Sequence, residues 1–410
     1  MFVISKLNVR NFKIAIIFVS QNMCIMLIER KVFSFISELK EKYPILAVTG
    51  PRQSGKTTLL KNLFSDYQYI SLENPDNRYF ALSDPNAFFA KYRNRVIFDE
   101  VQRLPDLFSY MQTIVDESGI MGQFILSGSQ NFHLMQNITQ SLAGRVAIIR
   151  LFPFDHLELA SANMLNDDCL FNIVKGYYPA IYSRNIPART FYSNYIQTYI
   201  QRDVSTLIAI KDLKLFQKFL SLCAGRAGQL LNLNSISNEC GISQPTAKSW
   251  LSALENSYIV FTLSPFHDNF SKRLVKTPKL YFYDTGLLSY LLGIADSDQL
   301  LVHPFKGLLF ENAMIAEYVK RMHHKNYLQD IWFWRDADGH EIDFVVQEGL
   351  SINLIEIKST QTIQPDLFNG LEFFTSRSKS YHIKKTLVYA GNDHQDRSIA
   401  EIVPWFEFGK

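Results

Sequence analysis

Apolar runs that end in polar or glycine-rich segments alternate with helical patterns over the first part of the chain. The runs at residues 45–49, 67–72, 95–98 and 123–126 have the composition of strands. Apolar residues recur at helical spacing over 29–41, and a second helix is predicted to begin at 57. This alternation predicts an α/β fold, with a parallel sheet covered on both faces and a ligand at the carboxyl ends of the strands. We assign residues 26–154 to this domain.

The pattern changes after residue 154. Residues 155–212 contain helical stretches and little strand pattern, so we predict a small helical lid. Its aromatic side chains at helical spacing are interpreted as packing rather than as ligand contacts. These aromatic residues are Phe191, Tyr192, Tyr195 and Tyr199.

Residues 213–295 are predicted to form a winged helix-turn-helix. A short helix and tight turn at 234–243 precede a second helix at 244–255, and a strand at 258–263 supplies a wing. Gly241 lies where the turn needs it, Ser243 can cap the second helix, and Pro245 is tolerated in its first turn.

The last 115 residues, 296–410, read as a further α/β domain. A helix opens at 307, strands at 332–335 and 341–346 flank a turn at 338–339, and a third strand covers 354–358. A chain of 410 residues is too long for one ordinary domain, which agrees with this division.

Composition narrows the class of protein without naming a partner. The 47% hydrophobic and 20% charged content is that of a folded protein, and the net charge of +3 is uninformative. The four cysteines lack CxxC spacing, which argues against a zinc site and a disulfide framework and favours a reducing cytoplasm.

The first 25 residues are treated as an extension outside the native domains. The basic residues Lys6, Arg10 and Lys13 precede an apolar core at 14–19 that is shorter than a usual signal peptide and lacks a cleavage site. It is also too short to span a bilayer, so we expect no membrane association. We favour Met26 as the true start over a working export signal.

Residues 50–58 have the pattern of a phosphate-binding loop between a strand and a helix. Gly50 and Gly55 let successive N–H groups point inward, Lys56 supplies charge for the β and γ phosphates, and Thr57 supplies a hydroxyl for Mg²⁺. The pattern therefore predicts a P-loop NTPase that binds ATP with Mg²⁺. The residues of the predicted loop are Gly50, Pro51, Arg52, Gln53, Ser54, Gly55, Lys56, Thr57 and Thr58.

Acidic and polar residues at the ends of later strands complete this predicted site. Asp99 and Glu100 have the form of a Walker B element, with Asp99 on Mg²⁺ through water and Glu100 orienting or deprotonating the attacking water. Ser127 or Ser129 is a candidate sensor of the γ-phosphate, or lies in a simple Ser-Gly turn. Arg145 is either a transition-state arginine, in cis or in a neighbouring subunit of a homo-oligomer, or a salt-bridged surface residue.

Four motifs together resemble the prokaryotic AAA-superfamily ATPases that carry a C-terminal domain of unassigned function. They are Gly-Pro-Arg-Gln-Ser-Gly-Lys-Thr-Thr from Gly50, Asp-Glu-Val-Gln from Asp99, Leu-Ser-Gly-Ser from Leu126 and Ser-Leu-Ala-Gly-Arg from Ser141. The resemblance continues through residues 176–179 and 199–203 and covers nearly everything after Met26. In that family a Glu usually precedes the Arg-Asp pair, where this chain has Gln201.

The predicted winged helix has a local basic charge. Residues 214–280 contain eight Lys or Arg against three Asp or Glu, which favours contact with DNA, mostly through phosphates. Lys248 is the basic residue of the recognition helix, and a cluster follows it. That cluster consists of Lys272, Arg273, Lys276 and Lys279.

The C-terminal strands place two carboxylates and a lysine within reach of one another. Glu356 and Lys358 share a strand face, and Asp343 on the adjacent strand can join them. This arrangement resembles the PD-(D/E)xK nuclease core, a restriction-endonuclease-like fold. The resemblance implies Asp343 and Glu356 as Mg²⁺ ligands, Lys358 activating water or steadying the phosphate, and Glu311 as the helix acid. A degenerate fold retained for protein or DNA contact is the alternative.

The sequence thus predicts a cytoplasmic Mg²⁺-dependent ATPase that acts on DNA through its winged helix and nuclease-like domain. One alternative is a nucleotide-dependent switch that binds a protein partner, with an inert C-terminal scaffold. Another is an ATP-controlled transcription repressor.

Overall fold

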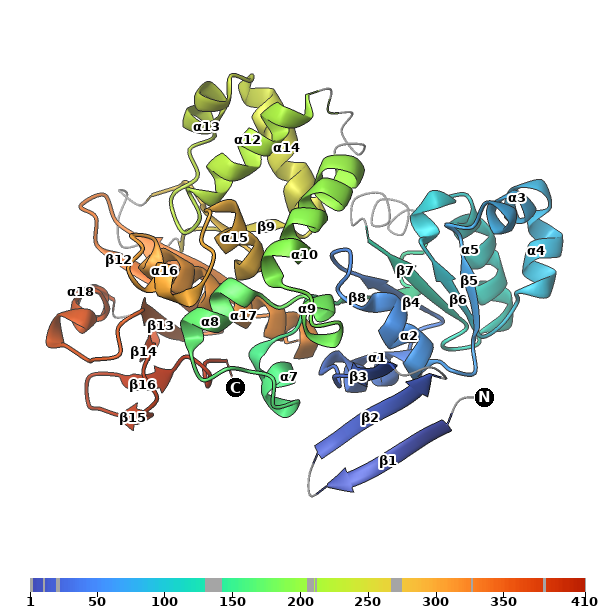
Figure 1. Cartoon of the computed structure of the whole chain (residues 1–410), viewed down its shortest axis with the longest axis horizontal. Helices are drawn as coiled ribbons and strands as arrows, with labels where there is room; N and C mark the ends of the chain where they lie inside the picture. The colour runs from blue at the N-terminus through green and yellow to red at the C-terminus, as the bar shows by residue number, and fades with distance from the viewer. Residues whose placement is uncertain are drawn as a thin grey trace. The chain divides into compact units, whose positions relative to one another are not determined.

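The computed structural model describes residues 3–9, 12–19, 23–129, 142–204, 210, 212–266, 275–325, 327–378 and 381–409, and for residues 3–27 and 201–203 it describes the backbone alone. The chain divides into two compact units. The first unit comprises Met1–Phe154, Asn256–Tyr258 and His323–Asn326, and the second comprises the remainder. The elements of both are labelled in Figure 1.

The first unit is built on a parallel sheet whose strand order is β5-β6-β7-β4-β8. Strand β7 therefore separates the strand that precedes the P-loop from the Walker B strand. The elements are β4 (Ile45–Thr49), β5 (Gln68–Ser71), β6 (Val96–Asp99), β7 (Phe124–Gly128), β8 (Val146–Arg150), α1 (Val32–Lys40), α2 (Lys56–Leu63), α3 (Pro75–Ser83), α4 (Pro85–Lys91), the short helix Val101–Arg103 and α5 (Leu107–Ser118).

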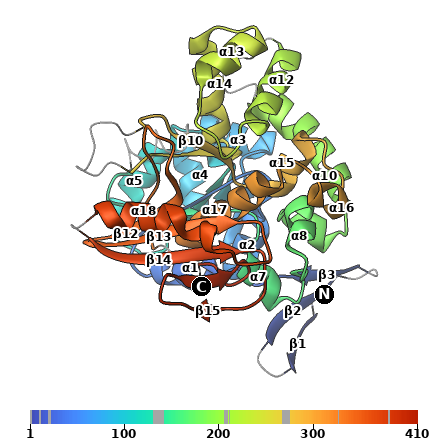
Figure 2. The same ribbon diagram turned by 90° about the vertical axis from the view of Figure 1, so that its left-hand side faces the viewer.

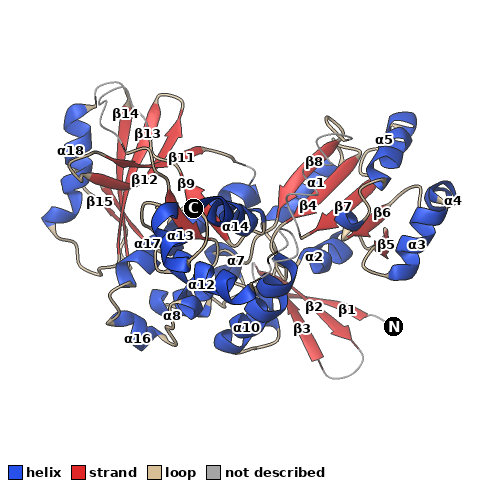
Figure 3. Cartoon of the chain, turned by 90° about the horizontal axis from the view of Figure 1, so that it is seen from above, coloured by secondary structure: helices blue, strands red, loops and turns tan. Residues whose placement is uncertain are grey.

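Helices cover both faces of this sheet, as the sequence predicted. Ile36 of α1 and Leu60 of α2 pack on one face, in a core with Val48 and Ile125. The other face packs against α3, α4 and α5, in a core that contains Phe88 and many other aromatic residues. Figure 3 shows α2 and α5 on opposite sides of the sheet. The continuously buried β4 and β6 are what a sheet covered on both faces requires.

Before the sheet, the chain forms three antiparallel strands in the order β1-β2-β3. No helix or strand is predicted over this extension from its sequence. The strands are β1 (Val3–Val9), β2 (Phe12–Val19) and β3 (Met23–Leu27).

Within the described residues, the second unit begins with helices and contains two sheets. Its aromatic stripe is buried, which confirms the interpretation of these residues as packing. The first elements are α7 (His156–Ser161), α8 (Cys169–Lys175), α9 (Pro179–Ser183), α10 (Ala188–Tyr195), a π-helix (Ile196–Val204), α12 (Leu213–Ala224), α13 (Leu233–Cys240), α14 (Gln244–Asn256), β9 (Val260–Leu263), β10 (Lys279–Phe282), α15 (Thr285–Leu291) and α16 (Ser297–Leu301).

Helices α13 and α14 form the predicted helix–turn–helix pair. Gly241 has φ +81° at the turn, and the Ser243 hydroxyl accepts the backbone N–H of Thr246 at 3.2 Å, as expected for a cap. Trp250 packs edge-on against Phe216 and Phe219 of α12. Strands β9 and β10 then pair as an antiparallel hairpin.

The C-terminal sheet is mixed, with the order β11-β12-β13-β14-β16-β15. Helix α18 packs against it, in a core with Leu371 and Phe374 (Figure 2). No helix in the described part of the chain is long and apolar enough to cross a membrane. The elements are α17 (Lys306–Lys325), β11 (Asp330–Arg335), β12 (Glu341–Glu348), β13 (Ser351–Lys358), the short helix Pro365–Phe368, α18 (Asn369–Arg377), β14 (His382–Tyr389), β15 (Gln395–Asp396) and β16 (Glu401–Pro404).

Strand β12 contains a β-bulge beside its acidic residues. Trp332 pairs with Val345 and Trp334 pairs with Ile342, so β12 advances three residues where β11 advances two. Asp343 and Phe344 of β12 therefore lie opposite the single residue Phe333 of β11. A bulge re-aims the side chains around it, so strict alternation does not decide where Asp343 points.

Candidate functional site

The P-loop connects β4 to α2 through backbone conformations that favour glycine. Gly50 has φ +147°, and a Cβ there would lie 2.1 Å from the carbonyl oxygen of Leu151. Gly55 has φ +94° immediately before α2. Gln53, with φ +63°, is the non-glycine residue of the loop in the left-handed region. The loop therefore curls tightly and delivers Lys56 as the first residue of the helix.

Lys56 is buried, and backbone carbonyls surround its ammonium. Its Nζ donates to the carbonyl oxygens of Gly50 at 2.9 Å and Pro51 at 2.8 Å. Burial lowers the pKa of Lys56 to about 8, although the charges of Glu100 and Asp99 offset part of the shift. No carboxylate of the described residues forms an ion pair with it, and an ammonium buried in this way attracts anions, as a phosphate-binding lysine must.

The Walker A and Walker B residues meet at Asp99. The Thr57 hydroxyl donates to Oδ2 of Asp99 at 3.0 Å, and the Tyr69 hydroxyl donates to the same oxygen at 2.5 Å. A hydroxyl and a carboxylate in contact are the donor set that Mg²⁺ uses in P-loop proteins. The donors present therefore fit the predicted metal.

Glu100 follows Asp99 in a strained conformation. It has φ +57°, and its carboxylate accepts a 2.5 Å hydrogen bond from the side chain of Gln102. Burial is the main cause that raises the pKa of Glu100, while Lys56 opposes the shift. A half-buried carboxylate with a raised pKa takes up a proton more readily than an exposed one, which suits a general base.

Strand β7 brings polar residues between the two Walker strands. Ser127 aligns with Asp99 in the parallel register, and Gly128 aligns with Thr49. Ser129 is buried just beyond the strand. The buried hydroxyls of Ser127 and Ser54 have no hydrogen-bond partner within the described residues. Buried hydroxyls of this kind are normally satisfied, so these two remain available to a ligand.

Arg145 lies on the surface in an ion pair. Its guanidinium contacts both carboxylate oxygens of Asp116, at 2.5 and 2.8 Å. This ion pair agrees with the second predicted role of Arg145, that of a salt-bridged surface residue. Its role as a transition-state arginine stays a prediction. The preceding residues 130–141 lie outside the described part of the chain, as do the side chains of Gln201 and the Arg-Asp pair that follows it.

Two residues that sequence reasoning missed support the loop. Arg30 is buried, donates to the carbonyl oxygens of Ser54 at 2.9 Å and Phe152 at 2.6 Å, and lies over the ring of Phe154. Tyr69 holds Asp99. Arg30 belongs to no recognisable motif, so the sequence gives no signal for its role. Tyr69 lies in an alternating pattern that predicts a strand, but the pattern does not indicate its contact with Asp99.

A second polar cluster lies in the C-terminal sheet. The ammonium of Lys358 is 2.9 Å from Asp343 Oδ2 and 2.7 Å from Glu356 Oε2, and the backbone N–H of Ile357 donates to Asp343 at 2.8 Å. Burial and the charge of Asp343 raise the pKa of Glu356. Burial also opposes ionisation of Asp343, but Lys358 and Lys279 hold its pKa below the ordinary value. The three predicted residues are thus brought together.

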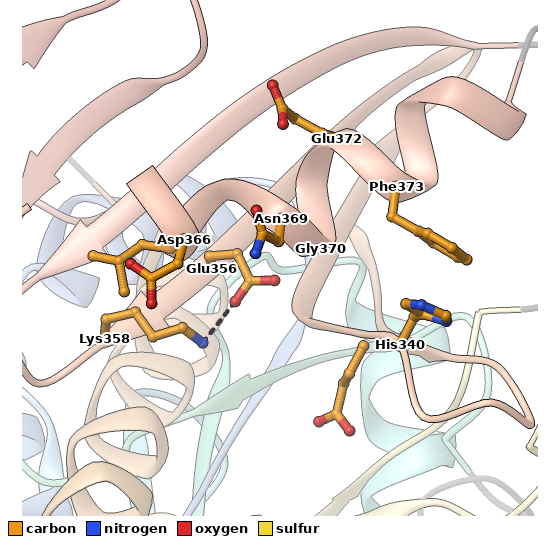
Figure 4. Close-up of a pocket in the computed structure, with 10 residues that line it drawn as sticks. His340, Glu356, Lys358, Asp366, Asn369, Gly370, Glu372 and Phe373 are labelled. Atoms are coloured by element: carbon orange, nitrogen blue, oxygen red, sulfur yellow. Dashed lines mark ion pairs between the residues drawn. The ribbon is translucent and has the colours of Figure 1, made fainter. Parts of the chain in front are cut away.

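A pocket of about 580 Å³ opens beside this cluster. Figure 4 shows Glu356 and Lys358 at one side of the pocket and Asn369 and Gly370 of α18 next to them. A Cβ at position 370 would lie 2.5 Å from Glu356 Oε1, so the close approach of α18 requires glycine. Most of the side chains that line the pocket are polar or charged, and several are carboxylates. The pocket therefore suits a ligand that binds carboxylates.

The fourth predicted residue, Glu311, has different partners. Its Oε1 accepts from the Tyr281 hydroxyl at 2.6 Å and lies 3.1 Å from the ammonium of Lys279. Lys279 is therefore buried in ion pairs, and its assignment to a DNA-contacting cluster was wrong. The reason is that its strand faces α17 and the acidic end of β12.

The other predicted DNA contacts are only partly described. Lys248 lies exposed on α14, and Lys276 is exposed before β10. Lys272 and Arg273 lie outside the described residues. Contact of this segment with DNA stays a prediction. In the described part of the chain the cysteines Cys169, Cys223 and Cys240 are buried and free.

Comparison with protein families divides the chain into three matched segments. Residues 42–160 match the family described as AAA domain. Residues 166–298 and 306–408 match two families described as domains of unknown function, DUF8612 and DUF4143 respectively.

Known relatives give no activity for the whole chain. Uncharacterized proteins of Mycobacterium bovis and Mycobacterium tuberculosis are each 29% identical over 342 residues, which is 83% of this chain and 76% of theirs.

Solved structures resemble the fold only distantly. The Walker-type ATPase of Pyrococcus abyssi has 14% identity and a TM-score of 0.44, with 65% of this chain and 96% of that chain covered. AMPPCP-bound DnaA from Aquifex aeolicus has 15% identity and a TM-score of 0.29, with 55% and 85% covered. The strand order, the P-loop geometry and the matched AAA domain together support an AAA-type P-loop ATPase fold for the first unit.

Proposed function

We propose that the first unit binds and hydrolyses ATP with Mg²⁺. The observation that carries this proposal is the hydrogen bond between Thr57 and Asp99, because it joins the Walker A and Walker B residues at one edge of the sheet. The buried Lys56, with a lowered pKa and two backbone carbonyl oxygens on its ammonium, supports the same function.

Each residue of the site has a role that follows from its surroundings. Lys56 and the loop N–H groups would hold the phosphates, and Thr57 and Asp99 would hold Mg²⁺. Bound Mg²⁺ would neutralise charge on the phosphate oxygens. Tyr69 fixes the carboxylate of Asp99. Glu100, half-buried and held by Gln102, would take a proton from the attacking water.

Removal of the Lys56 ammonium tests nucleotide binding. Charge-assisted hydrogen bonds contribute ~1.5–3 kcal/mol each, so Lys56→Ala should weaken ATP binding by up to about 100-fold. Lys42→Ala, which removes an exposed lysine that pairs with Glu38 in the same unit, is the control and should bind ATP normally. Isothermal titration calorimetry measures both. Unchanged ATP affinity in Lys56→Ala would rule out the site.

We further propose that ATP hydrolysis is coupled to DNA through the segment α12–α14 and the β9–β10 hairpin. The support is the helix–turn–helix pair with its capped second helix, and the exposed Lys248 and Lys276. The contacts would be mainly to phosphates, so affinity for duplex DNA should fall steeply as salt rises.

DNA-stimulated ATP hydrolysis separates this proposal from its rivals. Duplex DNA should raise the ATPase rate of the wild-type chain, and Lys248→Ala with Lys276→Ala should reduce the effect. Lys42→Ala, which removes an exposed lysine of the first unit outside this segment, is the control. An ATPase rate indifferent to DNA would favour a nucleotide-dependent switch for a protein partner. DNA binding confined to one sequence would favour an ATP-controlled repressor.

A second candidate function is phosphodiester cleavage in the C-terminal sheet. Its support is the convergence of Asp343, Glu356 and Lys358 beside a polar pocket. The oxygen donors of Asp343 and Glu356 fit a hard cation such as Mg²⁺, and Lys358 would steady the charge of the phosphate.

A nicking assay with Mg²⁺ or Mn²⁺ tests this second function. The wild-type chain should nick supercoiled DNA, whereas Asp343→Ala and Lys358→Ala should not. Lys384→Ala, which removes an exposed lysine from the same sheet, is the control. Equal nicking by all four proteins would assign the activity to another site or to a contaminant.

A further inference from the structure

Lys279 of strand β10 lies buried between two carboxylates of the second unit. Its Nζ is 3.1 Å from Glu311 on α17 and forms an ion pair with Glu341 on β12. The side chain is 3% exposed. The ammonium therefore stands inside the protein as a cation that oxygen ligands surround.

The strand that delivers this lysine is fixed in place. The backbone N–H of Phe282 donates to Asn312 Oδ1 at 2.9 Å, and the Asn312 side chain donates back to the Phe282 carbonyl at 2.8 Å. Tyr281 donates to the same oxygen of Glu311 that Lys279 contacts. Strand β10 is thus hydrogen-bonded to α17 through Phe282 and Asn312, which fixes the backbone near Lys279. The hydrogen bond from Tyr281 fixes the carboxylate of Glu311.

The two lysines divide the acidic residues into two sets. Lys358 bridges Asp343 and Glu356, whereas Lys279 bridges Glu311 and Glu341. Arg335 also pairs with Glu341 at 2.8 Å. A divalent cation and an ammonium seek the same carboxylate oxygens, so they compete when both are near. Lys358 is one-third exposed beside the pocket, but Lys279 is enclosed.

We propose that Lys279 is an internal cation that occupies Glu311 and keeps it from ligating a metal ion. In this conformation Asp343 and Glu356 alone supply the carboxylates for a divalent cation. Because strand β10 is fixed on α17, the ammonium stays at Glu311, so Lys279 limits the metal affinity of the C-terminal cluster. This inference rests on the proposed metal site at Asp343 and Glu356.

Mn²⁺ binding to the full chain, measured by electron paramagnetic resonance of the free ion, tests the proposal. All proteins carry Asp99→Asn, which removes the predicted metal ligand of the first unit. In that background Glu311→Gln should leave the Mn²⁺ affinity unchanged within about twofold. Lys279→Met should tighten it at least fivefold, and the double variant should return to the parent value. Lys384→Met removes the same charge from an exposed position of the sheet and should have no effect.

Three results would overturn the inference. Weaker Mn²⁺ binding in Glu311→Gln alone would show that Glu311 already ligates the ion. Unchanged or weaker binding in a folded Lys279→Met would show that the ammonium does not compete. A double variant as tight as Lys279→Met would place the gain elsewhere. The Glu311→Gln arm decides by itself if Lys279→Met does not fold. Asp343→Ala tests the proposed metal site separately, because it should abolish Mn²⁺ binding whatever Lys279 does.

Discussion

The two units each bury a lysine, and the two lysines have opposite surroundings. Lys56 is 7% exposed and Lys279 is 2% exposed. The ammonium of Lys56 contacts the carbonyl oxygens of its own loop, and burial lowers its pKa to about 8. Burial also disfavours the charge of Lys279, but Glu311 and Glu341 reverse this and raise its pKa above the ordinary value.

This difference separates a site that awaits an anion from one that is already neutralised. Carbonyl dipoles satisfy the hydrogen bonds of an ammonium but do not cancel its charge. An incoming phosphate would complete the environment of Lys56. Two carboxylates complete that of Lys279, so it has no electrostatic demand for a further ligand. The lowered pKa of Lys56 reflects the first environment, and the raised pKa of Lys279 reflects the second.

The largest expected effect is the loss of stability when Lys279 is replaced. Lys279→Met should lower the free energy of unfolding of the second unit by about 3 kcal/mol, because it leaves the half-buried Glu311 without its ammonium, whereas Glu341 keeps its ion pair with Arg335. All four tryptophans lie in this unit, so urea unfolding followed by tryptophan fluorescence reports on it. Lys384→Met breaks an exposed pair and should cost less than about 1 kcal/mol. Equal losses of unfolding free energy in Lys279→Met and Lys384→Met would contradict the view that the ion pairs of Lys279 stabilise the second unit.

Replacing Lys56 should have a smaller effect that depends on pH. Between about pH 8 and 10.5 the unfolded chain keeps the proton that folded Lys56 has lost, so the wild-type stability rises with pH through this window. Relative to Lys56→Met, the gain is at most about 1.4 kcal/mol per pH unit. Below pH 8 the two proteins should differ by a constant amount. Thermal unfolding without nucleotide, followed by circular dichroism at pH 7 to 10, measures the difference, and a flat difference throughout contradicts the lowered pKa.

The hydroxyl of Tyr69 should affect metal use rather than nucleotide binding. Tyr69→Phe removes one hydrogen bond to Asp99, worth about 0.5–1.5 kcal/mol. We expect a severalfold rise in the Mg²⁺ concentration that gives half-maximal ATP hydrolysis. The affinity for ATP without Mg²⁺ should stay constant. Tyr43→Phe, a tyrosine before β4, is the control, and a shift of equal size in that variant would assign the effect to packing.

The smallest effect is expected at the exposed pair of Arg145 and Asp116. Arg145→Ala should leave the unfolding midpoint of the first unit unchanged, since solvent screens this contact. The same variant separates the two roles of Arg145. A large fall in the ATP turnover rate with an unchanged midpoint would favour the transition-state role, and an unchanged turnover rate would leave a surface ion pair.

The prediction of local elements from the sequence was accurate where pattern and motif agreed. The predicted helix at 29–41 is observed as α1, and the predicted strands at 67–72 and 123–126 correspond to β5 and β7. Asp343, Glu356 and Lys358 also converge as expected, although a bulge in β12 rather than simple alternation sets the position of Asp343. Lys279 was misassigned because its charge is visible in the sequence and its burial is not.

The sequence by itself determined the P-loop, since the two glycines, Lys56 and Thr57 act through local backbone geometry within nine residues. It likewise determined the alternation of strands and helices. The tertiary structure decided which distant groups meet: Thr57 with Asp99, Lys358 with two carboxylates, and Lys279 with Glu311. The physical reason is that a lysine's role depends on the charges within a few ångströms of its ammonium, and these come from segments far apart in the chain.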